Sequence, residues 1–248
     1  MKGITITNEK GGVGKTFYAT HLAHRLTELG NKVVFIDADG QGNGTRFFKP
    51  YLSKTLAIDF FTKELNNIKL TNLLVFPSTR SILAVNTIYR EIIYSNKELL
   101  KEIGYEYIIF DTAPTLSKLT FAVLSLSDGA FIPINMGDFA LDGVSNVIST
   151  IKKVNKTSHT DVYGLMPNFV SGLSKEHKIA LGQLISNYPN KILPFLSQRT
   201  PYTSVMNGHT PLWNITPQYG NIKQASHQLI GVMNAMVEKI NEKELTNA

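Results

Sequence analysis

The sequence has 248 residues, of which 43% are hydrophobic and 18% are charged, the balance of a globular protein large enough for a substantial core. It contains no cysteine, which excludes disulfides, thiolate zinc sites and cysteine-ligated iron–sulfur clusters. No apolar run reaches the roughly eighteen residues of a membrane-spanning helix. The first residues already read as a strand, so we expect no signal peptide and a cytoplasmic location. The formal charge of +6 suits a polyanionic partner such as a nucleic acid, although it would equally suit small anions.

The chain opens with a short strand, a glycine-rich loop and a helix. Residues 4–7 alternate β-branched side chains and predict a buried strand. Apolar residues recur at helical spacing over residues 17–29, and Gly30 and Asn31 follow as a stop signal. Residues 8–16, Asn-Glu-Lys-Gly-Gly-Val-Gly-Lys-Thr, therefore lie between a strand and a helix, which is the context of a phosphate-binding loop.

The composition of this loop predicts a site for nucleotide phosphates and a magnesium ion. Backbone N–H groups can turn inward around a phosphate where no Cβ obstructs them, and the N-terminus of the following helix adds a partial positive charge. Lys15 would neutralise the β- and γ-phosphates, and the Thr16 hydroxyl would occupy a position on Mg²⁺. The residues expected to contact the nucleotide here are Lys10, Gly11, Gly12, Val13, Gly14, Lys15, Thr16 and Phe17.

The loop departs from the ordinary phosphate-loop pattern at its start. Glu9 stands where the first glycine would be, and a second lysine, Lys10, opens the loop. In this form the loop resembles the deviant Walker A motif of the ParA/MinD group of ATPases. The resemblance implies that the nucleotide is ATP and that Lys10 reaches across a dimer interface to the phosphates of the partner subunit. The alternative is a glycine-rich turn with a solvated lysine.

A second buried strand is predicted over residues 32–37, followed by a glycine-rich loop over residues 37–45. This loop resembles the Asp-x-Asp-x-Gln switch segment of the same family. The resemblance implies that Asp39 helps to position the attacking water and that Asp37 lies near the metal. Gly40 stands where ParA proteins often carry proline, which would make the switch looser. Without the resemblance, both aspartates are compatible with capping residues of a turn. The catalytic residues implied are Lys10, Lys15 and Asp39.

The middle of the chain gives weaker patterns until a third strong strand. Helices are predicted over residues 53–65 and 82–103, with a minor strand at 73–76. Residues 105–111 predict a buried strand that ends on Asp111 and resembles a Walker B element. The carboxyl ends of parallel strands meet at one edge of a sheet, so Asp111 would lie beside the phosphate loop and hold the Mg²⁺ shell through water. The expected metal residues are Thr16, Asp37 and Asp111.

The remaining elements continue the alternation of strands and helices. Asn168 closes one strand, where the family tends to place a polar residue that contacts adenine, although a surface turn is the alternative. Pro194 belongs to the last predicted strand, and the loop that follows approaches the base in relatives. The predicted elements are strands at 131–135, 162–168 and 192–195, and helices at 139–154 and 221–245.

This alternation predicts one α/β domain over residues 1–248, with a mainly parallel twisted sheet and helices on both faces, as in deviant Walker P-loop NTPases. Mg-ATP binding and hydrolysis follow from the motifs, and the Asn-Lys-x-Asp sequence typical of guanine readers is absent. The resemblance implies a ParA-type partition or cargo-positioning ATPase. Its ATP-bound homodimer would hold nucleoid DNA non-specifically, and a ParB-like adaptor on the centromere or cargo would trigger release. The sequence shows no N-terminal helix-turn-helix motif before the phosphate loop, and in this it resembles the short partition ATPases.

Basic residues of the C-terminal third are the candidates for DNA contact, although each alone is most simply a solvated charge. Two other functions stay open. A MinD-like membrane ATPase ends in a basic amphipathic helix, whereas residues 238–244 hold two lysines and three glutamates, so a membrane partner is not expected. A metabolic ATP-dependent ligase or synthetase would need further substrate-binding residues, and none stands out. The DNA candidates are Lys152, Lys153, Lys156, Lys175, Lys178, Arg199 and Lys223.

Overall fold

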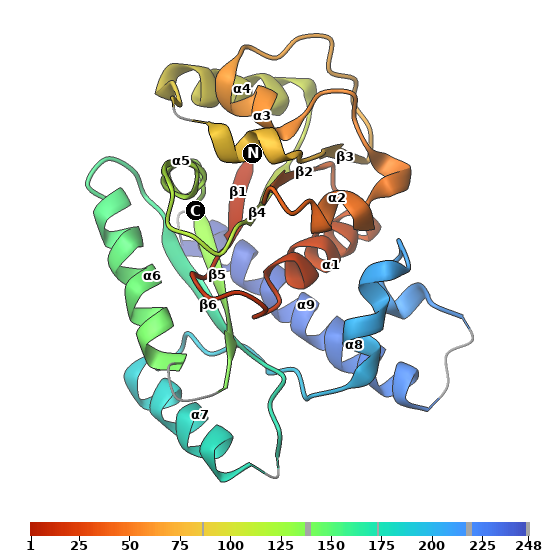
Figure 1. Ribbon diagram of the computed structural model, residues 1–248, viewed down its shortest axis with the longest axis vertical. Coiled ribbons are helices and arrows are strands. Elements are labelled where there is room, and N and C mark those ends of the chain that lie inside the picture. The colour runs from red at the N-terminus through yellow and green to blue at the C-terminus, as the bar shows by residue number, and fades with distance from the viewer. Residues whose placement is uncertain (86, 137–139, 173, 217–219, 247–248) are drawn as a thin grey trace.

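The computed structural model describes the chain except for residues 86, 137–139, 173, 217–219 and 247–248 (Figure 1). Its centre is a six-stranded sheet in which every strand pair is parallel, with the order β3-β2-β4-β1-β5-β6. The predicted parallel α/β fold is therefore confirmed. The strands are β1 (Lys2–Ile6), β2 (Val33–Ala38), β3 (Leu73–Phe76), β4 (Tyr107–Thr112), β5 (Gly129–Asn135) and β6 (Asp161–Asn168).

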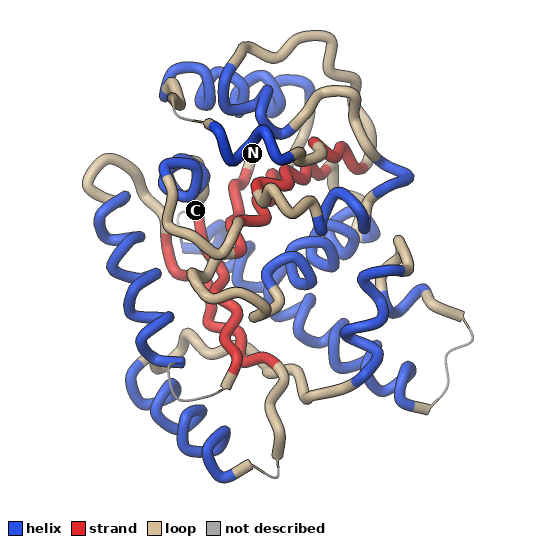
Figure 2. The backbone as a smooth tube through the Cα atoms, viewed as in Figure 1, coloured by secondary structure: helices blue, strands red, loops and turns tan. Residues whose placement is uncertain are grey.

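Helices cover both faces of this sheet (Figure 2). On one face lie α1 (Lys15–Glu28) and α9 (Asn221–Thr246). The other face is covered by α3 (Ala57–Thr62), α4 (Arg90–Ile103), α5 (Lys118–Ser125), α6 (Ala140–Val154) and α7 (Lys175–Asn187). The short elements are α2 (Asn43–Phe47), α8 (Thr200–Ser204) and the 3-10 turns η1 (Lys49–Tyr51), η2 (Arg80–Ala84), η3 (Val205–Asn207) and η4 (Leu212–Asn214).

Strand β4 illustrates why the central strands are apolar along their whole length. Tyr107 and Ile109 pack into the core beneath α1 and α9, whereas Ile108 and Phe110 pack into the core beneath α3, α4 and α5. Successive side chains of a strand point to opposite faces, and both faces are covered here. The apolar runs that predicted buried strands therefore reflect a sheet enclosed between two helical layers.

All strands end at the same side of the sheet, called here the carboxyl edge. The chain builds β2, β3 and β4 on one side of β1 and then crosses to add β5 and β6 on the other. A crossing of this kind opens a crevice at the carboxyl edge. The register sets Asp111 of β4 between Ile6 of β1 and Asp37 of β2. The loop that follows β1 consequently lies beside both aspartates.

The helix predicted over residues 82–103 is wrong in its first part. The structure has the 3-10 turn η2, then non-helical residues, and α4 begins only at Arg90. Val85 and Tyr89 have extended backbone angles, which the β-branched residues between them also favour. Asn86, which the predicted helix includes, lies outside the described residues.

The strand predicted at residues 192–195 is also wrong. Ile192 forms an isolated parallel bridge to Leu165 of β6, and the N–H of Leu193 donates to the carbonyl of Leu165 at 2.9 Å. Pro167 of β6 has no N–H to donate to the carbonyl of Leu193, and the next hydrogen bond runs from the N–H of Leu196 to the carbonyl of Pro167 at 3.1 Å, so no regular ladder forms. The segment follows β6 without becoming a seventh strand.

The strand predicted at residues 73–76 is confirmed with its bounds, and the other predicted elements are confirmed with shifted ends. The helix predicted over residues 53–65 is shorter because the Asp59 carboxylate accepts a hydrogen bond from the N–H of Leu56 at 3.0 Å and fixes the start of α3. The helix predicted over residues 139–154 is confirmed from Ala140 onward, and Phe139 lies outside the described residues. The sequence patterns do not predict α2, α5 or α8.

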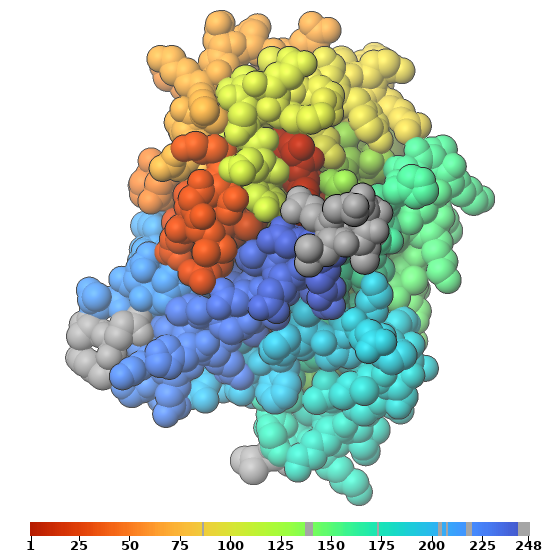
Figure 3. Space-filling model, turned by 180° about the vertical axis from the view of Figure 1, so that it is seen from behind, coloured from red at the N-terminus to blue at the C-terminus, as the bar shows by residue number. Residues whose placement is uncertain are grey.

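The C-terminal helix α9 lies across the middle of the view in Figure 3, where it is drawn in blue. No described helix is long and apolar enough to cross a membrane. The side chains that α9 buries recur at helical spacing, as predicted, and include Ala225, Leu229, Met233, Met236 and Ile240.

Candidate nucleotide site

The loop between β1 and α1 has the backbone that a phosphate-binding loop requires. Gly12 and Gly14 have φ angles of +70° and +100°, in the left-handed region that L side chains rarely adopt. Gly11 is exposed, and no heavy atom of the described residues lies within 4 Å of the position of an added Cβ. The helix α1 begins at Lys15 immediately behind these glycines. The loop therefore leaves an open concavity at a helix N-terminus, which suits a phosphate group.

Three asparagines hold this loop to the sheet. Asn8, at the start of the loop, donates from Nδ2 to a carbonyl of β5 at 2.8 Å. Asn135, the last residue of β5, donates to the carbonyl of Gly12 at 3.2 Å. Asn168, the last residue of β6, donates to the carbonyl of Val13 at 2.8 Å. The amides of Asn135 and Asn168 thus fix two loop carbonyls, whereas Asn8 Oδ1 accepts a hydrogen bond from the N–H of Lys10 at 3.0 Å.

Asn168 has a role that the sequence does not predict. Its side chain is fully buried, and its Oδ1 accepts a hydrogen bond from the N–H of Phe169 at 3.0 Å. A Cβ on Gly14 would lie only 2.5 Å from its Nδ2, so the amide packs directly against the loop. The expected contact with adenine remains a prediction. Pro194, the other predicted base-side residue, is exposed and is absent from the described walls of the two cavities at this edge.

The two lysines of the loop point in different directions. Lys15 is buried, and its Nζ donates to the carbonyl of Lys10 at 2.9 Å. Burial lowers the pKa of Lys15, whereas the charges of Asp111 and Asp39 act in the opposite direction. The side chain of Lys10 is exposed. The ammonium group of Lys15 therefore lies inside the site, and the side chain of Lys10 lies at its exposed rim.

Asp37 is engaged by the segment that follows it. Its Oδ2 accepts hydrogen bonds from the N–H and the hydroxyl of Thr45, both at 2.7 Å, and its Oδ1 accepts one from the N–H of Asp39 at 3.2 Å. Burial raises the pKa of Asp37 to about 6, although the bonds from Thr45 lower it. Asp37 thus anchors α2 to the end of β2, and its predicted place near the metal remains a prediction.

Asp111 is the carboxylate with free oxygens. It is fully buried, and neither oxygen receives a well-formed hydrogen bond from a described residue. Burial and the charges of Asp37 and Asp39 raise the pKa of Asp111 well above its usual range. The nearby Thr16 hydroxyl and the Lys15 ammonium favour the charged form. A buried carboxylate without donors needs a cation or ordered water for its oxygens.

The residues present fit a magnesium ion bound together with nucleotide phosphates. The described residues contain no cluster of three or more His, Asp or Glu side chains that could hold a metal alone. Mg²⁺ commonly uses one or two protein groups and completes its shell with phosphates and water. Thr16 and Asp111 would hold it here, and the ion would neutralise charge on the phosphates.

The switch segment brings Asp39 to the site. Asp39 is mostly buried, lines the same cavity as Lys15, and accepts a hydrogen bond from the N–H of Gln41 at 2.9 Å. A Cβ on Gly40 would lie 2.6 Å from Cγ of Leu83 in η2. A residue with a Cβ at this position would require the exposed side chain of Leu83 to move. The looser switch expected from Gly40 remains a prediction.

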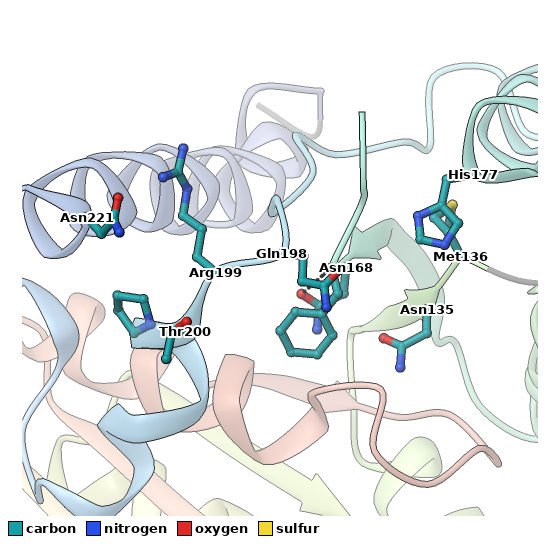
Figure 4. A pocket seen from close by; sticks show the side chains of 10 residues that line it. Asn135, Met136, Asn168, His177, Gln198, Arg199, Thr200 and Asn221 are labelled. Atoms are coloured by element: carbon teal, nitrogen blue, oxygen red, sulfur yellow. Dashed lines mark hydrogen bonds between the residues drawn. The ribbon is translucent and has the colours of Figure 1, made fainter. Parts of the chain in front are cut away.

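Two cavities adjoin at Phe169 on the carboxyl edge. The phosphate cavity, of about 930 Å³, is lined by the loop, by Asp39, and by Arg46 and Lys49, which no sequence motif indicates. The only signal for these two cations is their closeness in sequence to the switch segment. The base-side cavity has a volume of about 640 Å³. Figure 4 shows its labelled residues, Asn135, Met136, Asn168, His177, Gln198, Arg199, Thr200 and Asn221.

The predicted DNA-contact residues fall into two separate groups. The edge group lies at the carboxyl edge. Arg199 lines the base-side cavity, Lys175 and Lys178 begin α7, and Lys223 lies in the first turn of α9. The far group lies at or just beyond the C-terminal end of α6, a helix that starts at the carboxyl edge and runs back to the opposite edge. The far group is Lys152, Lys153 and Lys156. DNA contact by either group remains a prediction.

The parallel sheet, the glycine loop and the buried aspartates define a P-loop nucleotide-binding protein. The profile of an AAA domain family matches residues 1–163. Soj of Bacillus subtilis, a sporulation initiation inhibitor protein, is 35% identical over 175 residues, which cover 65% of this chain and 69% of that protein. The chromosome-partitioning ATPase Soj of Thermus thermophilus is 25% identical over 227 residues, which cover 91% and 84% of the two chains. The chain therefore belongs to this AAA domain family, within its ParA/Soj group of partition ATPases.

Solved structures agree with this assignment at the level of the fold. The ATP complex of the D38A variant of McdA from Cyanothece superposes with a TM-score of 0.78 at 20% identity, covering 96% of each chain. The chain spans only 64% of the length of protein IncC of Escherichia coli, with which it shares 26% identity over 87% of its own length.

Proposed function

We propose that this protein is a ParA-type partition or cargo-positioning ATPase. Binding of Mg-ATP drives face-to-face dimerisation, the dimer binds DNA without sequence preference, and an adaptor of the ParB kind stimulates hydrolysis to ADP and phosphate. In this proposal the protein works in the cytoplasm, associated with the nucleoid. The observation that carries the proposal is the loop with two lysines, of which Lys15 is buried in the site and Lys10 is exposed outside it.

Each lysine has a separate task in this proposal. Lys15 binds the phosphates of its own subunit. Lys10 extends from the rim of the same loop, where it can reach phosphates held by a second copy and offset charge that develops during hydrolysis, as an arginine finger does. Asp39, which lines the phosphate cavity, orients the attacking water. Support for the order of events comes from family membership and from the placement of these three side chains.

DNA binding is assigned to the edge group of basic residues. Its members lie at the carboxyl edge with the nucleotide site, so pairing two subunits at this edge joins two basic surfaces. Electrostatic affinity for DNA grows with the number of phosphates contacted, so a dimer binds more tightly than a monomer. A membrane role is less well supported, because the tail has an excess of glutamates over lysines.

The Lys10→Ala variant tests the dimer. We expect it to bind Mg-ATP with an affinity close to that of the parent, because the side chain is exposed and the carbonyl that holds Lys15 is retained. We also expect it to remain monomeric in light scattering and to hydrolyse ATP slowly. Lys54→Ala, which removes an exposed lysine away from the loop, is the matched control. Dimerisation and turnover of Lys10→Ala at the parental level would refute the assigned role.

A further inference from the structure

A third cavity, the rear groove, lies away from the nucleotide site between the start of α4, the helix α5 and the turn that follows α6. It has a volume of about 740 Å³. Figure 1 shows α5 between α4 and the C-terminal end of α6. The groove is lined by Ile88, Arg90, Leu116, Lys118, Phe121 and Thr157, among others.

The walls of the rear groove expose apolar side chains. Phe121 of α5 is 38% exposed and Leu116 is 37% exposed, and the neighbouring Tyr89 is 55% exposed. The floor is formed by buried residues, Ile93 and Ala122. Exposed apolar side chains gathered around one groove commonly mark an interaction site.

The charge at the rear groove has one sign. Its described lining contains Arg90 and Lys118 and no carboxylate. Arg90 is held in place, because its Nη2 donates to the carbonyl of Thr157 at 2.9 Å and its guanidinium lies 5.3 Å from the ring centroid of Tyr94. This bond also ties α4 to the turn that follows α6.

That turn carries the far group of lysines to the groove. The N–H of Lys156 donates to the carbonyl of Lys153 at 3.4 Å, and the N–H of Thr157 donates to the carbonyl of Val154 at 3.1 Å. Lys152, Lys153 and Lys156 are exposed, and Lys156 immediately precedes Thr157, which lines the groove. Lys152 and Lys153 lie in the last turn of α6, directly before this turn. The far group therefore follows α6 to the end of the groove marked by Thr157, whereas Leu116 and Lys118 at the start of α5 form the end closer to the nucleotide site.

We propose that the rear groove and the far group form a docking surface for an acidic amphipathic helix of a partner protein. The apolar face of such a helix covers Phe121 and Leu116, and its carboxylates pair with the far group. Duplex DNA fits this surface less well, because its polar backbone offers nothing to the apolar walls. The inference goes beyond the proposed function, because docking here requires neither ATP nor dimerisation.

The docking surface also has a short connection to the nucleotide site. Pro114 lines the phosphate cavity, and Leu116 lines the rear groove only two residues further along the chain. The carbonyl of Thr115 accepts a hydrogen bond from the hydroxyl of Thr120 in α5 at 2.7 Å. A helix bound against α5 therefore lies against the segment that leads back to Asp111.

The test measures binding of a defined probe to the nucleotide-free protein by fluorescence anisotropy. The probe is a labelled helical peptide of about 18 residues, with leucines at helical spacing and glutamates on its other face. A peptide with lysines in place of the glutamates and a random 20-base-pair duplex serve as the other two ligands. The double variant Lys153→Glu/Lys156→Glu reverses the far group, and Lys175→Glu/Lys178→Glu makes the same charge change at the carboxyl edge. Phe121→Gln removes the apolar contact.

We expect the acidic peptide to bind and the basic peptide not to bind. Lys153→Glu/Lys156→Glu and Phe121→Gln should each weaken binding by roughly tenfold, whereas Lys175→Glu/Lys178→Glu should change it little. The inference is overturned if the acidic peptide does not bind, if both double variants weaken binding equally, or if the duplex displaces the peptide from the groove. Because no nucleotide is present, these outcomes are independent of whether the protein is an ATP-driven dimer.

Discussion

Asn168, the last residue of β6, has two possible roles: it holds the phosphate loop in shape, or it contacts the adenine base of the nucleotide. Its amide is fully buried and bonds to the carbonyl of Val13, so its first effect is on the shape of the phosphate loop. A residue that contacts only adenine would instead leave the phosphate part of the site unchanged. The two roles predict different results for ligands with and without a base.

We expect Asn168→Ala to weaken binding of Mg-ATP and of magnesium tripolyphosphate by a similar factor, roughly fivefold for one lost hydrogen bond of about 1 kcal/mol. Calorimetric titration of both ligands measures this directly. Asn187→Ala, at the exposed end of α7, is a control for the loss of an asparagine. A loss confined to Mg-ATP would instead identify Asn168 as a base contact.

At the same scale, the sequence predicts the chemistry of individual residues better than their contacts. The spacing of glycines and lysines around Lys15 is sufficient to predict the phosphate loop, because the motif itself carries the required backbone. The sequence does not predict that Asp37 is held by Thr45 while Asp111 has free oxygens, because both simply end apolar strands. That difference depends on the path of the switch segment, which brings Thr45 back to β2.

Among the elements, α1 is held to the C-terminal region by a buried histidine. The Nδ1 of His21 lies 2.7 Å from the carbonyl of Phe17, and its Nε2 accepts a hydrogen bond from the N–H of Leu212 at 3.3 Å. This pattern requires a neutral ring with its proton on Nδ1. Burial lowers the pKa of His21 to about 3, so the folded protein resists protonating it.

The consequence is a defined loss of stability in acid. Because the pKa of His21 is about 3 when folded and near 6.5 when unfolded, its stabilising effect is complete above pH 6.5. It is lost as the pH falls toward 3, by up to about 1.4 kcal/mol per pH unit. Urea unfolding of the parent and of His21→Gln at pH 7.5, 6 and 5 should show a shallower decline for the variant. His227→Gln, on the exposed side of α9, should follow the parent. Parallel declines for the parent and His21→Gln would contradict this account.

The elements that the sequence predicts wrongly share a cause. Residues 82–89 have helical spacing of apolar side chains, but Val85 and Tyr89 have extended backbone angles, and α4 begins only at Arg90. Residues 192–195 read as a strand, but Pro167 of β6 has no N–H to donate to them, and the pairing stays an isolated bridge at Ile192. In both cases the apolar side chains predict a regular element, whereas the backbone angles or hydrogen bonds of the folded chain do not form one. The long buried strands, in contrast, were predictable because both of their faces are apolar.

At the scale of the whole molecule, the structure separates basic residues that the sequence places in one region. The edge group lies with the nucleotide site, and the far group lies at the opposite edge of the sheet, next to Thr157 at one end of the rear groove. A charge count cannot make this distinction, because strand β6 lies between the two groups and carries the chain from the opposite edge of the sheet back to the carboxyl edge. DNA binding that depends on ATP should use only the edge group.

The central claim is that ATP creates a DNA-binding dimer, and a salt series on random duplex DNA tests it most directly. The Asp39→Ala variant, expected to retain ATP without hydrolysing it, is measured with Mg-ATP and with Mg-ADP. We predict binding with Mg-ATP only, with log affinity falling linearly in log salt by about 0.9 per phosphate neutralised. Lys223→Ala on this background should make the slope shallower, whereas Lys153→Ala should leave it unchanged. Equal binding with ATP and ADP, binding that does not depend on salt, or no binding at all would contradict the account.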